Sequence, residues 1–240
     1  GSRDNVTRAL DGVSFDVAAG EYVAIMGPSG SGKTTLLNCI STIDRPTSGH
    51  ILVDGQDITA LRPGQLSKFR RERLGFVFQD SNLLDTLTAR ENIALALTIN
   101  HTPAKEVTAR VGGVARRLGV ADVLDKFPHE MSGGQKQRVA AARAIVTDPS
   151  LVLADEPTGA LDSRNSRLLL ESLEELNDAG ATIIMVTHDS FAASYARRAL
   201  FLKDGRVWNE LVRGTKTRKT FFNEIMDVVS FLGGEGADVR

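Results

Sequence analysis

The 240-residue sequence predicts an α/β fold with a mainly parallel central sheet. Short runs rich in valine and isoleucine have the length and composition of buried strands. Longer stretches with helical spacing separate these runs, and a glycine-rich segment links the first buried run to the next helix. Strands that alternate with helices in this way are typical of parallel sheets covered on both faces.

The expected strands and helices follow in chain order. An alternating strand is expected at 13–17, and buried strands at 22–26, 75–78, 151–154 and 182–186. Helical patterns cover 32–42, 89–97, 104–118, 133–146 and 166–177. The tail, 216–232, follows a basic run and has helical spacing that predicts an amphipathic helix docked on its own domain through Phe222, Ile225, Met226 and Val229.

These elements predict one domain over residues 1–240. Its core would comprise 1–79 and 146–215, with an antiparallel β portion near the N-terminus. Residues 80–145 contain helical patterns without a convincing strand, so a helical subdomain inserted into the sheet is expected there. No stretch approaches the ~20 apolar residues that span a bilayer, and no signal peptide is visible.

Composition narrows the function classes. Hydrophobic residues make up 42% and charged residues 25%, as in ordinary globular proteins. The formal net charge of −1 gives no overall field that would attract nucleic acid, and no nucleic-acid partner is expected. The single cysteine, Cys39, excludes an internal disulfide and fits a reducing compartment.

The glycine-rich segment matches the pattern G-x-x-x-x-G-K-[ST] between an expected strand and an expected helix. Backbone N–H groups and the helix N-terminus would cradle phosphates there, Lys33 would reach the β- and γ-phosphates, and Thr34 would bind Mg²⁺. A glycine-rich turn with a solvated lysine is the alternative. The residues expected around the phosphates are Gly27, Pro28, Ser29, Gly30, Ser31, Gly32, Lys33, Thr34 and Thr35.

Polar residues follow three further strands. Asp155 and Glu156 end a buried run, where Asp155 could hold Mg²⁺ and Glu156 could polarise the attacking water. Helix-capping acids are the alternative interpretation. Gln79 could reach the metal or water, or be a surface glutamine. His188 could donate to the γ-phosphate, or be a structural histidine.

Ser132-Gly133-Gly134-Gln135 opens an expected helix and would form a second anion cradle, although serine is also a common N-cap. Two such cradles suggest two nucleotides, or one nucleotide held between two copies of the chain.

Together, these motifs resemble the nucleotide-binding domain of ABC transporters over nearly the whole chain. Met131 stands where that family usually has leucine, and both side chains are apolar. In chain order the motifs are Gly27–Thr34, Gln79, Met131–Gln135, Asp155-Glu156, Ala160-Leu161-Asp162 and His188.

The resemblance implies a head-to-tail homodimer that holds ATP and Mg²⁺ between Gly27–Thr34 of one copy and Ser132–Gln135 of the other. Asp162 would communicate across the dimer, and Gln79 would couple the site to a transmembrane permease. His188 would steady the γ-phosphate, and Glu156 would make each site competent for hydrolysis. The chain would lie on the cytoplasmic face of a bacterial membrane.

Three segments, 25–38, 44–49 and 157–162, are similar to the branch that serves macrolide export, lipoprotein release and cell-division signalling. Within it, the tail Thr220–Met226 and segments 78–88, 132–138 and 184–189 resemble the bacitracin-type antimicrobial-peptide resistance transporters. That family pairs two ATPase copies with one permease and often works with a sensor kinase. The rest of the branch is the alternative.

Two other classes fit less well. Soluble ABC ATPases of DNA repair or translation carry large insertions or tandem cassettes, for which this length leaves no room. A non-hydrolysing ATP-binding signalling module is disfavoured by Glu156. Relatives also stack adenine on an aromatic ring near the N-terminus, commonly within Tyr-Gly, which places the expected tyrosine immediately before Gly1.

Overall fold

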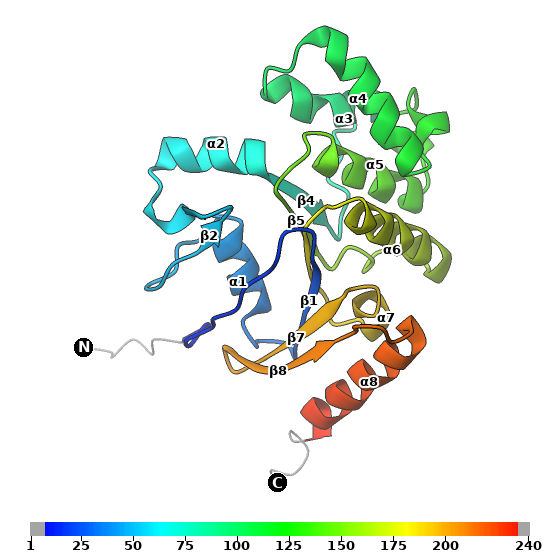
Figure 1. The fold of residues 1–240 in the computed structure, drawn as a ribbon. Helices are drawn as coiled ribbons and strands as arrows, with labels where there is room; N and C mark the ends of the chain where they lie inside the picture. The colour runs from blue at the N-terminus through cyan, green and yellow to red at the C-terminus, as the bar shows by residue number, and fades with distance from the viewer. Residues whose placement is uncertain (1–7, 235–240) are drawn as a thin grey trace, which may run out of the picture.

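The computed structural model describes residues 8–234, and its centre is a six-stranded sheet with helices on both faces (Figure 1). The strand order is β4-β5-β6-β1-β7-β8, in which every neighbouring pair is parallel except β7 and β8. The predicted mainly parallel sheet is confirmed. Its strands are β1 (Tyr22–Met26), β4 (Leu74–Phe78), β5 (Leu151–Asp155), β6 (Ile183–Val186), β7 (Arg198–Lys203) and β8 (Arg206–Val212).

Alternate residues of the central strands enter two hydrophobic cores, one on each face of the sheet. On β5, Val152 and Ala154 enter the larger core, whereas Leu151 and Leu153 enter the smaller one. Helix α1 (Lys33–Ile40) and helix α2 (Pro63–Arg73) contribute to the smaller core. The larger core receives side chains from helix α6 (Ser163–Asp178) and from the helices between β4 and β5. Burial on both faces explains why these strands read as continuous apolar runs.

The expected strand at 13–17 is wrong. Val13, Phe15 and Val17 are half-buried against the smaller core and the residues between them are exposed, yet no strand pairs with this segment. Alternating apolar and polar residues indicate that one side of a segment is buried. An extended segment can bury one side by packing alone, without hydrogen bonds to a neighbouring strand. The antiparallel structure in the first third of the chain is instead a short ribbon of β2 (Leu52–Val53) and β3 (Gln56–Asp57).

Three predicted helices lie between β4 and β5: α3 (Ala89–Ile99), α4 (Ala104–Arg117) and α5 (Gly133–Ile145). Residues 79–150 are all described and contain no strand. Thr88 caps α3 by accepting from the backbone of Glu91, whose carboxylate accepts in return from the backbone of Thr88 at 2.8 Å. Such a reciprocal box marks a helix start in sequence.

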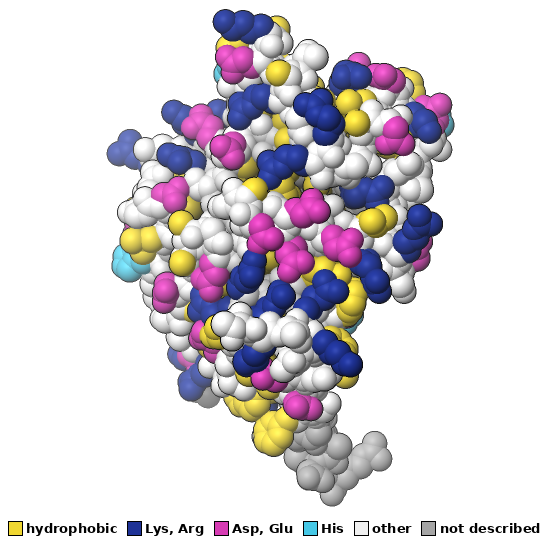
Figure 2. Space-filling view, turned by 45° about the vertical axis from the view of Figure 1, so that its right-hand side comes forward, with side chains coloured by type: hydrophobic (Ala, Val, Ile, Leu, Met, Phe, Trp, Pro, Cys, Tyr) yellow, Lys and Arg dark blue, Asp and Glu magenta, His cyan; other side chains and the backbone are white. Residues whose placement is uncertain are grey.

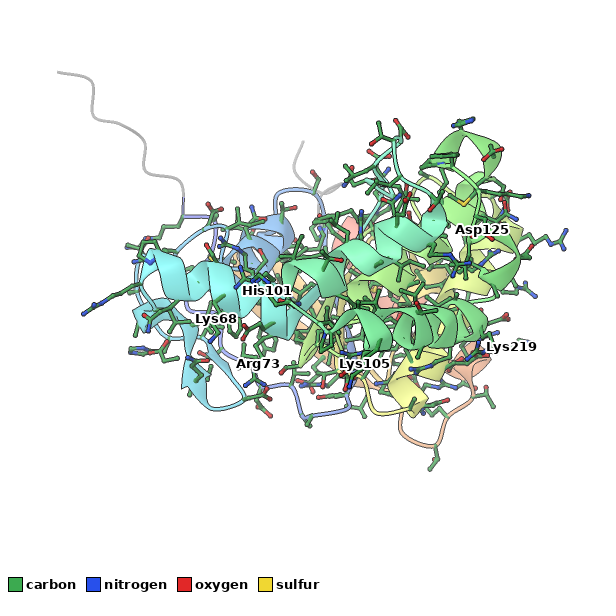
Figure 3. The ribbon with its side chains drawn as sticks, turned by 90° about the horizontal axis from the view of Figure 1, so that it is seen from above. Lys68, Arg73, His101, Lys105, Asp125 and Lys219 are labelled. Atoms are coloured by element: carbon green, nitrogen blue, oxygen red, sulfur yellow. The ribbon has the colours of Figure 1, made fainter. Side chains whose placement is uncertain are left out.

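Helix α2 was not predicted. It is strongly basic and buries only Leu66 and Phe69, so its hydrophobic periodicity is weak. Asn100 at the end of α3 donates to the backbone carbonyl of Arg71 at 2.9 Å, which joins α2 to the helical segment. Seen from above, Lys68 lies on α2 and Lys105 on α4, on either side of this junction (Figure 3).

The predicted C-terminal helix α8 (Arg218–Gly234) forms, and of its expected contact residues Ile225 is buried and Val229 is half-buried against the larger core. Phe221 and Ile225 are fully buried, whereas Phe222 is only half-buried and Met226 is 40% exposed. Apolar residues occur at neighbouring positions around this helix, so spacing alone allowed two faces. Phe231 stacks on Trp208 of β8, with ring centroids 5.8 Å apart. Within residues 8–234, no helix is long and apolar enough to cross a membrane.

Candidate functional site

The strand register brings four chain segments to one edge of the sheet. Phe78 of β4 pairs with Asp155 of β5, Asp155 with Val186 of β6, and Val186 with Ile25 of β1. The residues that follow these strands therefore emerge side by side at the carboxyl edge, which is where α/β sheets bind ligands. They include Gln79, Glu156, His188 and the glycine-rich segment Gly27–Thr34.

The glycine-rich segment requires glycine for steric reasons. A Cβ atom on Gly27 would lie 2.2 Å from the carbonyl oxygen of Leu202, and one on Gly32 would lie 2.5 Å from that of Ala9. Gly32 also has a φ of 101°, a conformation that favours glycine. Lys33, the first residue of α1, donates from Nζ to the carbonyls of Gly27 at 2.7 Å and Pro28 at 2.9 Å. The lysine thus lies folded into the loop that would hold phosphate.

Charges of both signs meet at this edge. Burial lowers the pKa of Lys33, and the nearby Glu156 and Asp155 oppose that shift. The pKa of Asp155 is raised by burial and by repulsion from Glu156, against the attraction of Lys33. Lys33 is thus a half-buried cation beside two carboxylates, and a bound polyphosphate and metal ion would change the balance of charge there.

Glu156 is held in one orientation by its neighbours. Its Oε1 accepts from the backbone N–H of His188 at 3.0 Å and lies 2.8 Å from Nδ1 of the same histidine. Its Oε2 accepts from the Thr187 hydroxyl at 3.0 Å. Glu156 has a φ of 45°, which is uncommon for a non-glycine residue and concentrates at functional sites. A cleft of about 500 Å³ opens beside Glu156 and His188.

The second predicted cradle lies elsewhere. Ser132 Oγ accepts from the backbone of Gln135 at 3.2 Å, and Gln135 Oε1 accepts from the backbone of Ser132 at 2.9 Å, so both residues cap α5. Among residues 8–234, no hydrogen bond joins Ser132–Gln135 to Gly27–Thr34. Gly134 instead lies against Asn165, because a Cβ on Gly134 would be 1.8 Å from the Asn165 side-chain oxygen.

Asp162 lies beside this second cradle rather than beside Gly27–Thr34. It caps α6 by accepting from the backbone and side-chain nitrogens of Asn165, both at 2.8 Å. These hydrogen bonds from Asn165 lower the pKa of Asp162. One asparagine thereby joins Asp162 to Gly134. Ser132–Gln135 and Asp162 are thus linked through Asn165, and among residues 8–234 no hydrogen bond joins them to Lys33 or Glu156.

Gln79 begins a loop whose supports were not predicted. Gln79 packs on Gly159, where an added Cβ would lie 2.9 Å from the glutamine Cδ. Arg143 donates to the carbonyls of Ser81 at 3.1 Å and Asn82 at 2.9 Å.

Two buried amides also support this loop. The side chain of Asn92 donates to the carbonyls of Leu84, Leu87 and Thr88. The side chain of Gln137 donates to the carbonyls of Phe78 and Pro157. The only sequence signal for these supporting residues, Asn92, Gln137 and Arg143, is a polar residue on the apolar face of a helix.

The donor types at the carboxyl edge fit magnesium. Thr34, Gln79 and Asp155 offer a hydroxyl, an amide oxygen and a carboxylate, and Mg²⁺ is commonly held by one or two carboxylates together with substrate phosphates. Across the part of the chain that the structure describes, no group of three histidine, cysteine, aspartate or glutamate side chains could hold a metal alone. A metal here would be held jointly with phosphate oxygens.

Comparison with known proteins identifies the family. A family model described as "ABC transporter" matches residues 10–159. The chain belongs to the ABC transporter family. The ABC transporter ATP-binding protein YxdL of Bacillus subtilis is 52% identical over 97% of this chain and 90% of its own length. The bacitracin export ATP-binding protein BceA of Halalkalibacterium halodurans is 49% identical over 98% of this chain and 93% of its own.

A solved structure shows the same ABC cassette fold. The dimeric bacterial ABC transporter cassette MJ0796 superposes with a TM-score of 0.78, at 39% identity over 88% of this chain and 93% of that one. A second structure of MJ0796 is a post-hydrolysis state bound to ADP and Pi. The chain is therefore an ATP-binding and ATP-hydrolysing subunit of an ABC transporter. The tyrosine expected before Gly1 lies outside the described residues.

Proposed function

We propose that this ATPase drives a permease that protects bacteria against bacitracin-like antimicrobial peptides. The match to the bacitracin export protein carries this proposal, because it extends over 98% of the chain and includes the tail beyond the nucleotide-binding motifs. A macrolide export ATP-binding/permease protein of Hyphomonas neptunium is 46% identical, but this chain spans only 32% of its length. Macrolide export is therefore the second candidate.

The site residues have distinct proposed roles. Gly27–Thr34 holds the ATP phosphates, with Lys33 released from its bonds to Gly27 and Pro28 to contact them. Thr34, Gln79 and Asp155 would hold Mg²⁺, which when bound neutralises charge that develops on the phosphates. Glu156, oriented by Thr187 and His188, positions and polarises the attacking water. His188 contacts the γ-phosphate from the same edge.

The proposed assembly uses both cradles. In the described part of the chain, residues 8–234, no hydrogen bond joins Ser132–Gln135 or Asp162 to Gly27–Thr34, and a second copy arranged head to tail would bring the second cradle to the nucleotide. The dimeric MJ0796 cassette supports a dimer of this chain. The permease would provide the membrane span, which places the chain at the cytoplasmic face of the membrane. A sensor kinase stays a prediction of the resemblance.

The domain organisation belongs to the same proposal. Residues 80–145 would form the helical subdomain that carries Ser132–Gln135, between core segments 1–79 and 146–215. Residues 216–232 would be a tail helix that docks on the core. The burial of Phe221 and Ile225 supports that docking.

The role of Glu156 is tested by Glu156→Gln, which keeps the shape of the side chain but removes its charge. We expect MgATP to bind and turnover to fall by about 10²-fold or more. Steady-state phosphate release at saturating MgATP measures this loss, and near-normal turnover would contradict the role.

The transported compound is tested in a sensitive bacterial host. The chain is expressed with its permease, and growth is measured against bacitracin and against a macrolide, with the Glu156→Gln pair as the inactive control. Protection from bacitracin that requires active Glu156 supports the proposal. Protection from the macrolide alone would favour the second candidate.

A further inference from the structure

One buried amide lies where three functional segments meet. Gln137 is on α5, the helix that begins after Ser132, and only 2% of its surface is exposed. Its Nε2 donates to the carbonyl of Phe78 and, at 3.1 Å, to the carbonyl of Pro157. Because both partners are carbonyl oxygens, only the NH₂ side of the amide can face them.

The two carbonyls belong to the segments that carry the proposed catalytic groups. Phe78 immediately precedes Gln79, and Pro157 immediately follows Glu156. Gln137 therefore joins the start of the permease-facing loop and the turn after the hydrolytic carboxylate to the helix that presents Ser132–Gln135. Register alone aligns β4 with β5, but it does not fix α5 relative to either strand.

A second contact makes α5 the common support of that loop. Arg143, six residues after Gln137 on the same helix, donates to the carbonyls of Ser81 and Asn82. Leaving buried hydrogen-bonding groups unpaired is costly, so the loop cannot shift away from α5 without breaking several bonds at once. The loop, α5 and the turn at Pro157 are thus expected to move together.

We propose that Gln137 is a positioning residue that couples the loop beginning at Gln79 to the carboxylate of Glu156 and to the Ser132–Gln135 segment. This inference rests on the proposed roles of Gln79 and Glu156. A movement of the loop, imposed by the permease, reaches Phe78 and is transmitted through the amide of Gln137 to Pro157 and α5. The amide contacts neither nucleotide nor water in this scheme.

The test compares Gln137→Met with a matched control elsewhere in the same chain. Asn177 is also a buried amide, and it donates at 2.8 Å to the carbonyls of Gly20 and Ala181. Gly20 precedes β1 and Ala181 precedes β6, so Asn177 lies at the opposite edge of the sheet from the site. Asn177→Leu thus removes the same kind of double contact without touching the proposed coupling.

Both variants are assayed as the full chain bound to its permease. We expect similar losses of thermal stability, whereas only Gln137→Met lowers kcat by about tenfold or more, with KM for MgATP changed by about twofold or less. Equal kcat values for the two variants would overturn the proposal. So would a change confined to KM, which would place Gln137 in binding rather than positioning.

A second variant tests the inference if Gln137→Met does not fold. Gln137→Asn keeps the donor group but is one methylene too short to reach both carbonyls, so kcat should again fall, and a wild-type kcat would overturn the inference. Glu156→Gln is measured alongside. If it abolishes turnover while Gln137 variants remain normal, only this inference fails; if it retains turnover, the role of Glu156 fails first.

Discussion

At the scale of single residues, several side chains have a structural and a proposed chemical role together. Ser132 and Gln135 cap α5 through reciprocal bonds, and the same helix start presents the second anion cradle. His188 hydrogen-bonds to Glu156. The histidine therefore has the bonded partner expected of a structural residue and still lies beside the proposed catalytic carboxylate. Steric overlap requires glycine at two positions of the glycine-rich segment, because a side chain on Gly27 or Gly32 would overlap a backbone carbonyl. The two interpretations of a motif are therefore often compatible.

Asp155 is predicted to weaken the nucleotide-free fold. Its pKa is raised by burial and by Glu156, so its ionised form costs stability above the folded pKa, and the cost disappears as the pH falls below the unfolded pKa. Asp155→Asn should raise the melting temperature at pH 7.5 in the presence of a chelator. This advantage should shrink as the pH is lowered toward 4. Thermal melts at both pH values measure it, and a lower melting temperature at pH 7.5 would contradict the prediction.

Lys33 is predicted to contribute to nucleotide affinity itself. Its ammonium group lies inside the phosphate loop, and Lys33→Ala removes the cation that would neutralise the phosphates. Titration with a fluorescent ATP analogue should show weaker binding, while the melting temperature without nucleotide changes little. Unchanged affinity together with lost turnover would show that Lys33 acts only in the transition state.

At the scale of elements, the sequence predicted the buried strands better than it predicted the strands at the β8 edge of the sheet and the tail helix. The buried strands β1, β4, β5 and β6 were recognised from continuous apolar runs, whereas β7 and β8 were missed. β8 is an edge strand with exposed and half-buried residues in alternation, and Asn209 and Glu210 interrupt its apolar pattern. β7 and β8 also pair through a register shift at Phe201/Leu202. An edge strand is partly polar because one side faces solvent, so its sequence resembles a loop.

Helix α8 gives a matched pair of neighbouring residues. Ile225 is fully buried, whereas Met226 is 40% exposed. Ile225→Ala should lower the free energy of unfolding by about 2–5 kcal/mol, because it removes packed atoms and leaves a cavity. Met226→Ala should change it by about 0.5 kcal/mol or less. Denaturant unfolding measures both values, and a larger loss for Met226→Ala than for Ile225→Ala would mean that Met226, and not Ile225, lies at the docked face.

At the scale of the whole molecule, the proposed nucleotide site uses two cradles of the chain, Gly27–Thr34 and Ser132–Gln135. Figure 2 shows acidic side chains gathered near the middle of the visible face, with basic side chains below and around them. In the proposed dimer, ATP would hold the two copies together, because each nucleotide gains contacts from the second cradle only in the dimer.

Assembly is predicted to depend on ATP. The Glu156→Gln chain should be largely monomeric without nucleotide, dimeric with ATP and monomeric with ADP, since hydrolysis removes the γ-phosphate contacts. Adding Ser132→Arg should abolish the dimer by steric block and excess charge. Ser230→Arg, at an exposed position of α8, is the control that should leave it intact. Analytical ultracentrifugation distinguishes these states, and crosslinks that place Ser132 far from any nucleotide would contradict the arrangement.

The sequence by itself predicted the family and the parallel sheet, and it marked the residues that are proposed to hold phosphate. These depend on local rules: a buried strand needs a continuous apolar run, and a phosphate loop needs glycines and a lysine at set spacing. The tertiary structure alone decided that 13–17 is unpaired, which face of α8 is buried, and that Gln137, Arg143 and Asn92 support the loop after Gln79. Those outcomes depend on which backbone carbonyls lie opposite a side chain, and residues far apart in the chain supply them only after it has folded.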